Sequence, residues 1–464
     1  MLDSFLKRSS IEPFITEAYR PSRLRGDAPR PNARRITAYD WERPLAVYPQ
    51  VRKGVILKIH RTLLFIFAIA IVFFFTNSQA AFGQQKSRLQ PSKKVKRADP
   101  IHHKAIPRPN SPRPNAGLNS PNGPSSPSLP LWTYNVVAGQ DNNNYSGTIV
   151  GRSPFNNGKR TTTIQAYLVP VIFNFSDGSV QDPTAFDPCA GDTVVDLVQK
   201  SPMFQTTDFT FTDANGNNPV DVGTTQYADA FQRANFWQYV SPNSNLITPY
   251  HTILNLNNVL GQVVQVPAAD GYIIGGSCQS GEIDYFWWDN YVTTTLIPAL
   301  ESQGTGVGPG SVPIFIFDSV VMNYNGSTAF GDHGAYYDSS NSLQTYVVAD
   351  FDTSGEWQDL YVSDVYVLSH EVAEWMNDPD TGNPTPGWTN PADGSCDNNY
   401  EVGDAFFGSP PLSPPVTMPN GFSYNLQELA FFSWFYDQDP SIAAGGMYSD
   451  GGSFTSDAGA ACTP

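Results

Sequence analysis

Apolar residues alternate with polar ones, or run on without interruption, in several segments after residue 131, and this pattern predicts β-strands. The segments 161–175, 311–324 and 342–351 are rich in β-branched and aromatic residues and are bounded by Gly, Asn and Ser. Such composition is typical of strands. The segment 245–261 has a similar composition, so we expect a strand there as well.

Helical spacing of apolar residues occurs in five further segments. They are 192–204 with Asp192 as its expected N-cap, 226–240, 283–302, 363–378 and 425–437. The last of these is apolar on nearly all sides, which predicts that it is buried. Because strands and helices mix without a strict βαβ alternation, the expected fold is α+β, with a mixed β-sheet and a central helix at 363–378.

The central segment carries one apolar face. Its residues at positions i, i+4, i+7 and i+8 are Leu368, Val372, Trp375 and Met376. We expect this face to lie against the core. Ser363 or Asp364 can cap the helix N-terminus. Pro379 ends the helix, because the residue before a proline is disfavoured in the α conformation.

Charge divides the chain into two parts. Residues 1–131 hold 22 Lys and Arg against 7 Asp and Glu, whereas residues 132–464 hold 5 Lys and Arg against 36 Asp and Glu. A basic arm and an acidic body are therefore expected to be separate. Because the body has almost nothing with which to neutralise phosphates, we expect no nucleic-acid partner.

An apolar run from Leu63 to Phe75 follows a short basic segment. Its 13 residues are fewer than the roughly 20 that span a bilayer, but they suit the h-region of a signal peptide. Small residues at 78–80 offer a cleavage site. The alternative is an uncleaved membrane anchor that extends to about Phe82.

These features predict four segments. They are a basic arm at 1–50, a signal peptide or membrane anchor at 51–83, a disordered Pro- and Ser-rich linker at 84–131, and an acidic extracytoplasmic domain at 132–464. If translation begins after the arm, the start is a non-AUG codon at Val51 or Val55. We expect the protein to be secreted, periplasmic or at the cell surface, and to meet a membrane only through its N-terminal segment.

All four cysteines follow the predicted signal segment. An even number of cysteines in an exported domain predicts two disulfides, for which three pairings are possible. We favour Cys189–Cys278 and Cys396–Cys462, each within its own half of the domain.

The central helix carries His370-Glu371-Val372-Ala373-Glu374, which differs from the zinc-protease signature H-E-x-x-H at its last position. His370 and Glu374 would lie about 6 Å apart on one helix face, as two ligands of one metal ion do. Glu371, offset by about 100° around the axis, would act as a general base on water. The alternative is an ordinary surface helix with scattered acidic residues.

Polar residues on either side of this helix extend the predicted site. Glu401 and Asp404, in DNNYEVGDAF, are expected as further ligands of Zn²⁺ or another divalent cation. His333, in GDHGAYYDSS, is expected in a loop between two predicted strands. It would complete the coordination or polarise a substrate oxygen, or else bond only to the backbone. His333 or Tyr336 would stabilise an oxyanion.

The stretches SHEVAEWMNDP and YEVGDAF resemble the H-E-L-A-E-x-x-[TS]-[ND]-P … E-I-G-D pattern of the exordium-like, phosphate-induced family of secreted plant proteins and their bacterial relatives. The resemblance covers residues 160–464 in layout and is specific near 330–404. Cys396 lies before E-V-G-D, where the plant members carry a cysteine after it. The resemblance implies export, association with cell walls and a common site, but no particular reaction.

Two functions fit these observations. The first is an exported, zincin-like, metal-dependent hydrolase that cleaves peptides. The alternative is a non-catalytic secreted protein that binds cell-wall polymer or carbohydrate through its Trp and Tyr residues and holds a structural metal. A glycosidase that uses two carboxylates is a third reading. No serine nucleophile motif, P-loop or Rossmann glycine pattern is present.

Overall fold

The computed structural model describes residues 128–155, 160–242, 249–276, 278–391, 394–410 and 415–463. The predicted basic arm, the predicted signal or anchor segment and the linker up to residue 127 lie outside these residues. The first strand begins at Leu131, one residue before the predicted start of the domain. No helix in the described ranges is long and apolar enough to cross a membrane.

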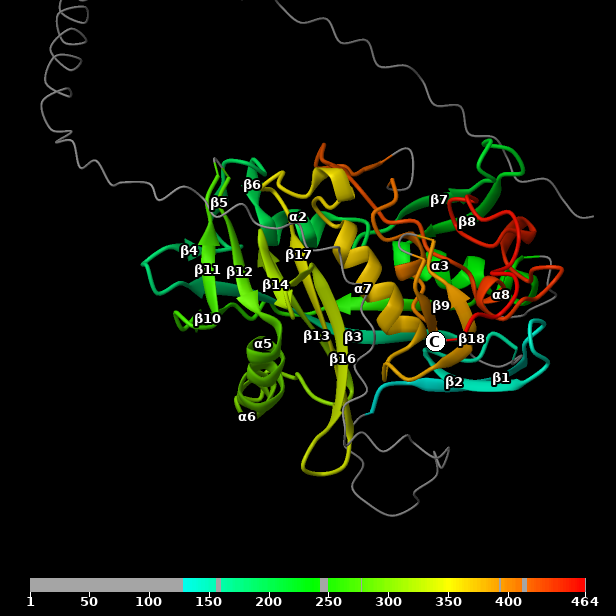
Figure 1. Cartoon of the computed structure of the whole chain (residues 1–464), viewed down its shortest axis with the longest axis horizontal. Helices are drawn as coiled ribbons and strands as arrows, with labels where there is room; N and C mark the ends of the chain where they lie inside the picture. The colour runs from blue at the N-terminus through cyan, green and yellow to red at the C-terminus, as the bar shows by residue number, and fades with distance from the viewer. Residues whose placement is uncertain are drawn as a thin grey trace, which may run out of the picture. The chain divides into compact units, whose positions relative to one another are not determined.

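A seven-stranded mixed sheet forms the centre of the domain (Figure 1). Its strands are β3 (Thr161–Asn174), β4 (Val180–Gln181), β9 (His251–Leu256), β10 (Gln262–Gln265), β13 (Ser311–Asp318), β16 (Gly331–Tyr337) and β17 (Leu343–Phe351). The long strand β3 pairs in parallel with β9, β10 and β13, and β13 pairs in parallel with β17. Strand β16 follows β17 as an antiparallel strand at the end of this order. The predicted α+β class and mixed sheet are confirmed.

Smaller sheets surround the central one. One has four strands, β11 (Gly271–Ile274), β12 (Ser280–Asp284), β14 (Val320–Tyr324) and β15 (Ser327–Ala329). The two-stranded pairs are β1 (Leu131–Val137) with β2 (Asn144–Val150), β5 (Phe186–Asp187) with β6 (Asp192–Thr193), β7 (Thr207–Phe211) with β8 (Val220–Thr225), β18 (Pro384–Thr389) with β19 (Cys396–Asn399), and β20 (Val416–Thr417) with β21 (Ser423–Tyr424).

Helices cover both faces of the central sheet. The α-helices are α2 (Val194–Lys200), α3 (Tyr227–Asn235), α4 (Trp237–Val240), α5 (Tyr285–Tyr291), α6 (Ile297–Ser302), α7 (Tyr366–Asn377) and α8 (Phe432–Phe435). A π-helical turn, η1 (Val292–Leu296), joins α5 to α6, and short 3₁₀ turns are η2 (Gln358–Leu360), η3 (Asp404–Phe406) and η4 (Ala444–Gly446).

Side chains alternate between the two faces of the sheet, as the period of a β-strand requires. On β13, Ile314 and Ile316 belong to the core that contains α3 and α7. Phe315 and Phe317 belong to a second core with α5 and α6. Figure 1 shows α7 on one side of these strands and α5–α6 on the other. The side chains of α7 therefore meet only the first face of the sheet.

Three predicted features differ from the structure. The N-cap of α2 is Thr193 rather than Asp192. The predicted strand 311–324 is broken at Ser319, whose φ of 52° is left-handed, so that β13 and β14 enter different sheets. The predicted helix 425–437 is helical only in α8. Its earlier residues are held in non-helical backbone by tertiary bonds, because Ser369 Oγ accepts from the Gln427 N–H and Val402 O accepts from the Ala430 N–H.

The structure contains the disulfides Cys189–Cys278 and Cys396–Cys462, as predicted. The second joins β19 to the C-terminal segment. It therefore ties that segment to the strand that precedes Glu401 and Asp404. In the unfolded chain this bridge closes a loop across 66 residues, which restricts the unfolded state and so stabilises the fold.

Candidate metal centre

Helix α7 is buried along its entire length, whereas the sequence predicted one core face. Its polar residues face buried polar groups from β16, from the loop before η3 and from the segment before α8. The predicted caps are also wrong, because the N-cap is Val365 and makes no side-chain cap bond. The Asp364 carboxylate instead accepts hydrogen bonds from the backbone N–H groups of Val365 and Asn425.

Gln427 sets the protonation of the His370 ring. Its Nε2 lies 2.7 Å from the carbonyl oxygen of Gly403, which can only accept, so this atom is the amide nitrogen. Its Oε1 therefore faces His370 Nδ1, at 2.6 Å, and accepts the proton that Nδ1 carries. The neutral ring is left with its lone pair on Nε2, and a buried partner on the other ring nitrogen is typical of histidines that bind metals.

His370, Glu374 and Asp404 form a first group of potential ligands, whose atoms all lie within 4.8 Å of one another. His370 Nε2 is 2.9 Å from Glu374 Oε2 and 3.5 Å from Asp404 Oδ1. In the neutral ring, the shorter contact brings two lone pairs together, which is unfavourable unless positive charge lies beside both. A cation about 2.1 Å from each atom fits this separation.

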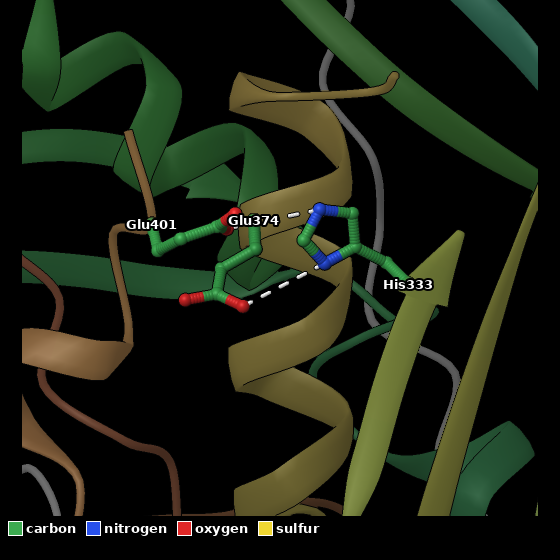
Figure 2. Close-up of side chains that lie close together, drawn as sticks. All are labelled: His333, Glu374 and Glu401. Atoms are coloured by element: carbon green, nitrogen blue, oxygen red, sulfur yellow. Dashed lines mark ion pairs between the residues drawn. The ribbon is translucent and has the colours of Figure 1, made fainter. Parts of the chain in front are cut away.

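His333, Glu374 and Glu401 form a second group with the same 4.8 Å limit. Figure 2 shows His333 pointing from β16 toward Glu374 on α7 and Glu401 on the loop before η3. His333 Nδ1 is 3.7 Å from Glu374 Oε2, and His333 Nε2 is 3.7 Å from Glu401 Oε2. These separations are too long for hydrogen bonds. They start from the two different ring nitrogens, whereas one ion binds only one of them; with one ligand atom from each residue, the three still lie within 4.8 Å of one another.

Glu374 lies in both groups because its two oxygens have different partners. Oε1 accepts hydrogen bonds from the backbone N–H groups of Gly403 and Asp404, at 2.9 and 3.1 Å. These bonds hold the carboxylate in place. Oε2 is the atom that faces both His370 and His333.

Several buried polar atoms of the cluster have no hydrogen-bond partner among the described residues. They are Nε2 of His333, Oε2 of Glu371 and both carboxylate oxygens of Glu401, joined by Nε2 of His370 and Oε2 of Glu374 while the His370 ring is neutral. An unpartnered buried polar atom costs about 1–3 kcal/mol, and more when it is charged. So many such atoms at one point indicate a ligand, and the imidazole and carboxylate donors are those of a divalent metal ion.

The pKa shifts also reflect the burial of these charged and polar groups without enough partners. Burial raises the pKa values of Glu371 and Glu401 well above their usual range and lowers the pKa of His333 to about 4. Burial also lowers the pKa of His370, but the carboxylates of Glu374, Glu371 and Asp404 together outweigh burial and raise the value to about 10. In the metal-free protein, a proton on His370 Nε2 would therefore take the place between His370 and Glu374 that a cation would occupy, and metal binding would have to displace it.

Glu371 lies beside both groups, at the wall of a small cavity. Its Oε2 is 3.5 Å from His333 Nδ1. The cavity has a volume of about 10 Å³ and is lined by residues that include Phe330, Tyr366 and His370. This volume is close to the space of one water molecule. Glu371 is thus placed where a carboxylate can take a proton from water.

The structure brings together six of the seven predicted site residues. These are His333, His370, Glu371, Glu374, Glu401 and Asp404. Tyr336 is not with them, because it is three residues from His333 on the same strand and so lies on the opposite face of the sheet. It packs against the core of α5 and α6. The sequence prediction had placed this segment in a loop, where that alternation does not apply.

The sequence analysis missed Gln427, which lies in the segment predicted as an apolar helix. A polar pair, Gln427-Glu428, interrupts the apolar run there, and this interruption was the available signal. Glu428 has a different role from Gln427. It accepts hydrogen bonds from Ser449 and Ser453.

Gly403 permits the close packing of its loop against His370. A Cβ atom at this position would lie 2.5 Å from His370 Nδ1. The His370 ring would have to move, and so would Gln427 Oε1, which bonds to the same nitrogen. We expect Gly403→Ala to weaken divalent-metal binding by about 10-fold or more, the usual scale for disturbed supports of metal ligands. Isothermal titration with Zn²⁺ measures this.

Gly261→Ala is the matched control, because a Cβ there would meet no atom within 4 Å. It should bind the metal as the unchanged protein does. Equal affinities for both variants would show that the loop tolerates a methyl group and that His370 is not held by this contact.

Comparisons with protein families, with curated proteins and with solved structures find no match to this chain.

Proposed function

We propose that the protein is a metal-dependent hydrolase, zincin-like in having its motif on a helix packed against a mixed sheet, and that it cleaves peptide bonds. The observation that carries the proposal is the position of Glu371. Oε2 of this carboxylate has no hydrogen-bond partner among the described residues. The side chain also lines a cavity that is about the size of one water molecule and lies beside the potential ligands His370 and Asp404.

The residues of the chain divide the work. His370, Glu374 and Asp404 would hold Zn²⁺ or another divalent cation, whose chemistry is to polarise a carbonyl group and lower the pKa of water. Glu371 accepts the proton of the attacking water and passes it to the leaving amine. Gln427 and the N–H groups of the Gly403–Asp404 loop orient His370 and Glu374, so that neither ligand must rearrange during the reaction.

Charge supports an amide rather than a phosphate ester as substrate. The domain has 36 acidic residues against 5 basic ones, and no Lys or Arg follows Arg233. His333 and His370 form ion pairs with the cluster carboxylates. An anionic substrate would meet repulsion from these buried carboxylates.

The two disulfides support export, because such bonds persist in oxidising compartments. We propose that the domain acts outside the cytoplasm on peptide or on the peptide part of a cell-wall polymer.

The test is hydrolysis of a mixed library of fluorogenic peptides by the purified protein. We expect cleavage that is lost after dialysis against a chelator and restored by Zn²⁺ or Mn²⁺. Metal binding without any cleavage, together with retention on cell-wall polysaccharide, would instead support the non-catalytic binding protein.

A further inference from the structure

We propose that the centre holds two divalent cations, bridged by Glu374, rather than one. The first site is formed by His370, Glu374 and Asp404, and the second by His333, Glu374 and Glu401. This inference extends the proposed function and rests on it for the first ion. Zn²⁺ and Mn²⁺ are the expected occupants, because the donors are imidazole and carboxylate with no thiolate.

The geometry separates the cluster into two sets that share one residue. The ligand atoms of each set lie within 4.8 Å of one another, and Glu374 is the member common to both. Because Oε1 of Glu374 is held by two backbone N–H groups, Oε2 is left to face both histidines. A carboxylate in this position bridges paired metal ions that are about 3.5–4 Å apart.

The second set has unpartnered atoms that the first ion does not explain. His333 is 5% exposed and Glu401 is 2% exposed. His333 Nε2 and both oxygens of Glu401 have no hydrogen-bond partner in the described part of the chain. The 3.7 Å between His333 Nε2 and Glu401 Oε2 is close to the separation of about 3.4 Å for two ligands that are each about 2.1 Å from one ion.

Protonation of Glu401 does not replace a second cation. It would remove the charge of Glu401, but His333 Nε2, 3.7 Å from Glu401 Oε2, would still have no hydrogen-bond partner among the described residues. A cation satisfies Glu401 and His333 together.

Charge balance also favours two ions. The cluster contains four buried carboxylates, those of Glu371, Glu374, Glu401 and Asp404. When all four are ionised, as metal binding requires of its ligands, one divalent cation would leave two negative charges on these carboxylates. Two divalent cations neutralise the four carboxylates, and buried charges persist only when they are compensated.

The experiment is to load the metal-free full-length protein with Mn²⁺, to measure bound metal after gel filtration, and to record its electron paramagnetic resonance spectrum. We expect two Mn²⁺ per chain and a spectrum broadened by coupling between them. Glu401→Gln should lower the content to one Mn²⁺ and give the six-line signal of an isolated ion. Asp404→Asn should also lower the content, through the other site.

Glu356→Gln is the control, because Glu356 is exposed and should leave two ions bound. One ion per unchanged chain would overturn the proposal without need of any variant. Complete loss of metal in Glu401→Gln, with the far-ultraviolet circular dichroism unchanged, would also overturn it in favour of a single shared site. Two coupled ions without peptide cleavage would uphold this inference and defeat the proposed function.

Discussion

Glu371→Gln is expected to lower the turnover number for peptide cleavage by about 10²-fold or more, the scale on which a general base contributes. Glutamine keeps the shape of the side chain but cannot take a proton from water. Because Glu371 is a neighbour of the ligand groups and not a member of either, bound metal should remain unchanged. Steady-state kinetics together with metal analysis of the same sample measure both quantities.

The control for this variant is Glu356→Gln, which makes the same chemical change at an exposed position and should retain full turnover. Loss of metal from Glu371→Gln would make Glu371 a ligand rather than a base. Full turnover with full metal would remove it from the mechanism. If the protein only binds its target, affinity for that target should be nearly unaffected by the substitution.

Removal of the metal is expected to lower the free energy of unfolding by about 4 kcal/mol, the contribution of a ligand present at about 1,000 times its dissociation constant. The reason is that Glu371, Glu374, Glu401 and Asp404 are all buried and would repel one another once the cations are gone. For a domain of this size we expect the melting temperature to fall by about 5 °C or more. Differential scanning calorimetry before and after chelation measures it.

Glu374→Gln provides the matched comparison, because Glu374 contributes to both groups. This variant should already melt at a lower temperature and should not respond to the chelator. Re-addition of Zn²⁺ should restore the melting temperature of the unchanged protein but should not raise that of the variant. A melting temperature that stays the same after all metal is removed would show that the fold tolerates the bare carboxylate cluster.

Local sequence patterns determined the elements whose geometry depends on near neighbours. The spacing of Leu368, Val372, Trp375 and Met376 predicted a helix, and α7 is that helix. The four-residue step from His370 to Glu374 predicted that both face one point, and their atoms lie 2.9 Å apart. Such relations follow from the helix period alone, so no tertiary information is needed.

The two-residue period of a β-strand could have been applied to the segment of His333 and Tyr336 as well, but that segment was predicted to be a loop. His333 and Tyr336 are on opposite faces because they are three residues apart on β16. A sequence interpretation that places them in a loop loses this constraint. The prediction for Tyr336 therefore failed at the assignment of secondary structure, before any question of chemistry arose.

Only the tertiary structure decided which distant residues meet at α7. Gln427 reaches His370 because Ser369, Gly403 and Val402 hold its segment in non-helical backbone, although the local pattern there predicts a helix. His333 and Glu401 lie 68 positions apart in the sequence, and both reach Glu374. Local periodicity sets the direction of a side chain relative to its own element, but packing between elements sets what it faces. The division of the ligands into two groups that share Glu374 is therefore a property of the folded chain.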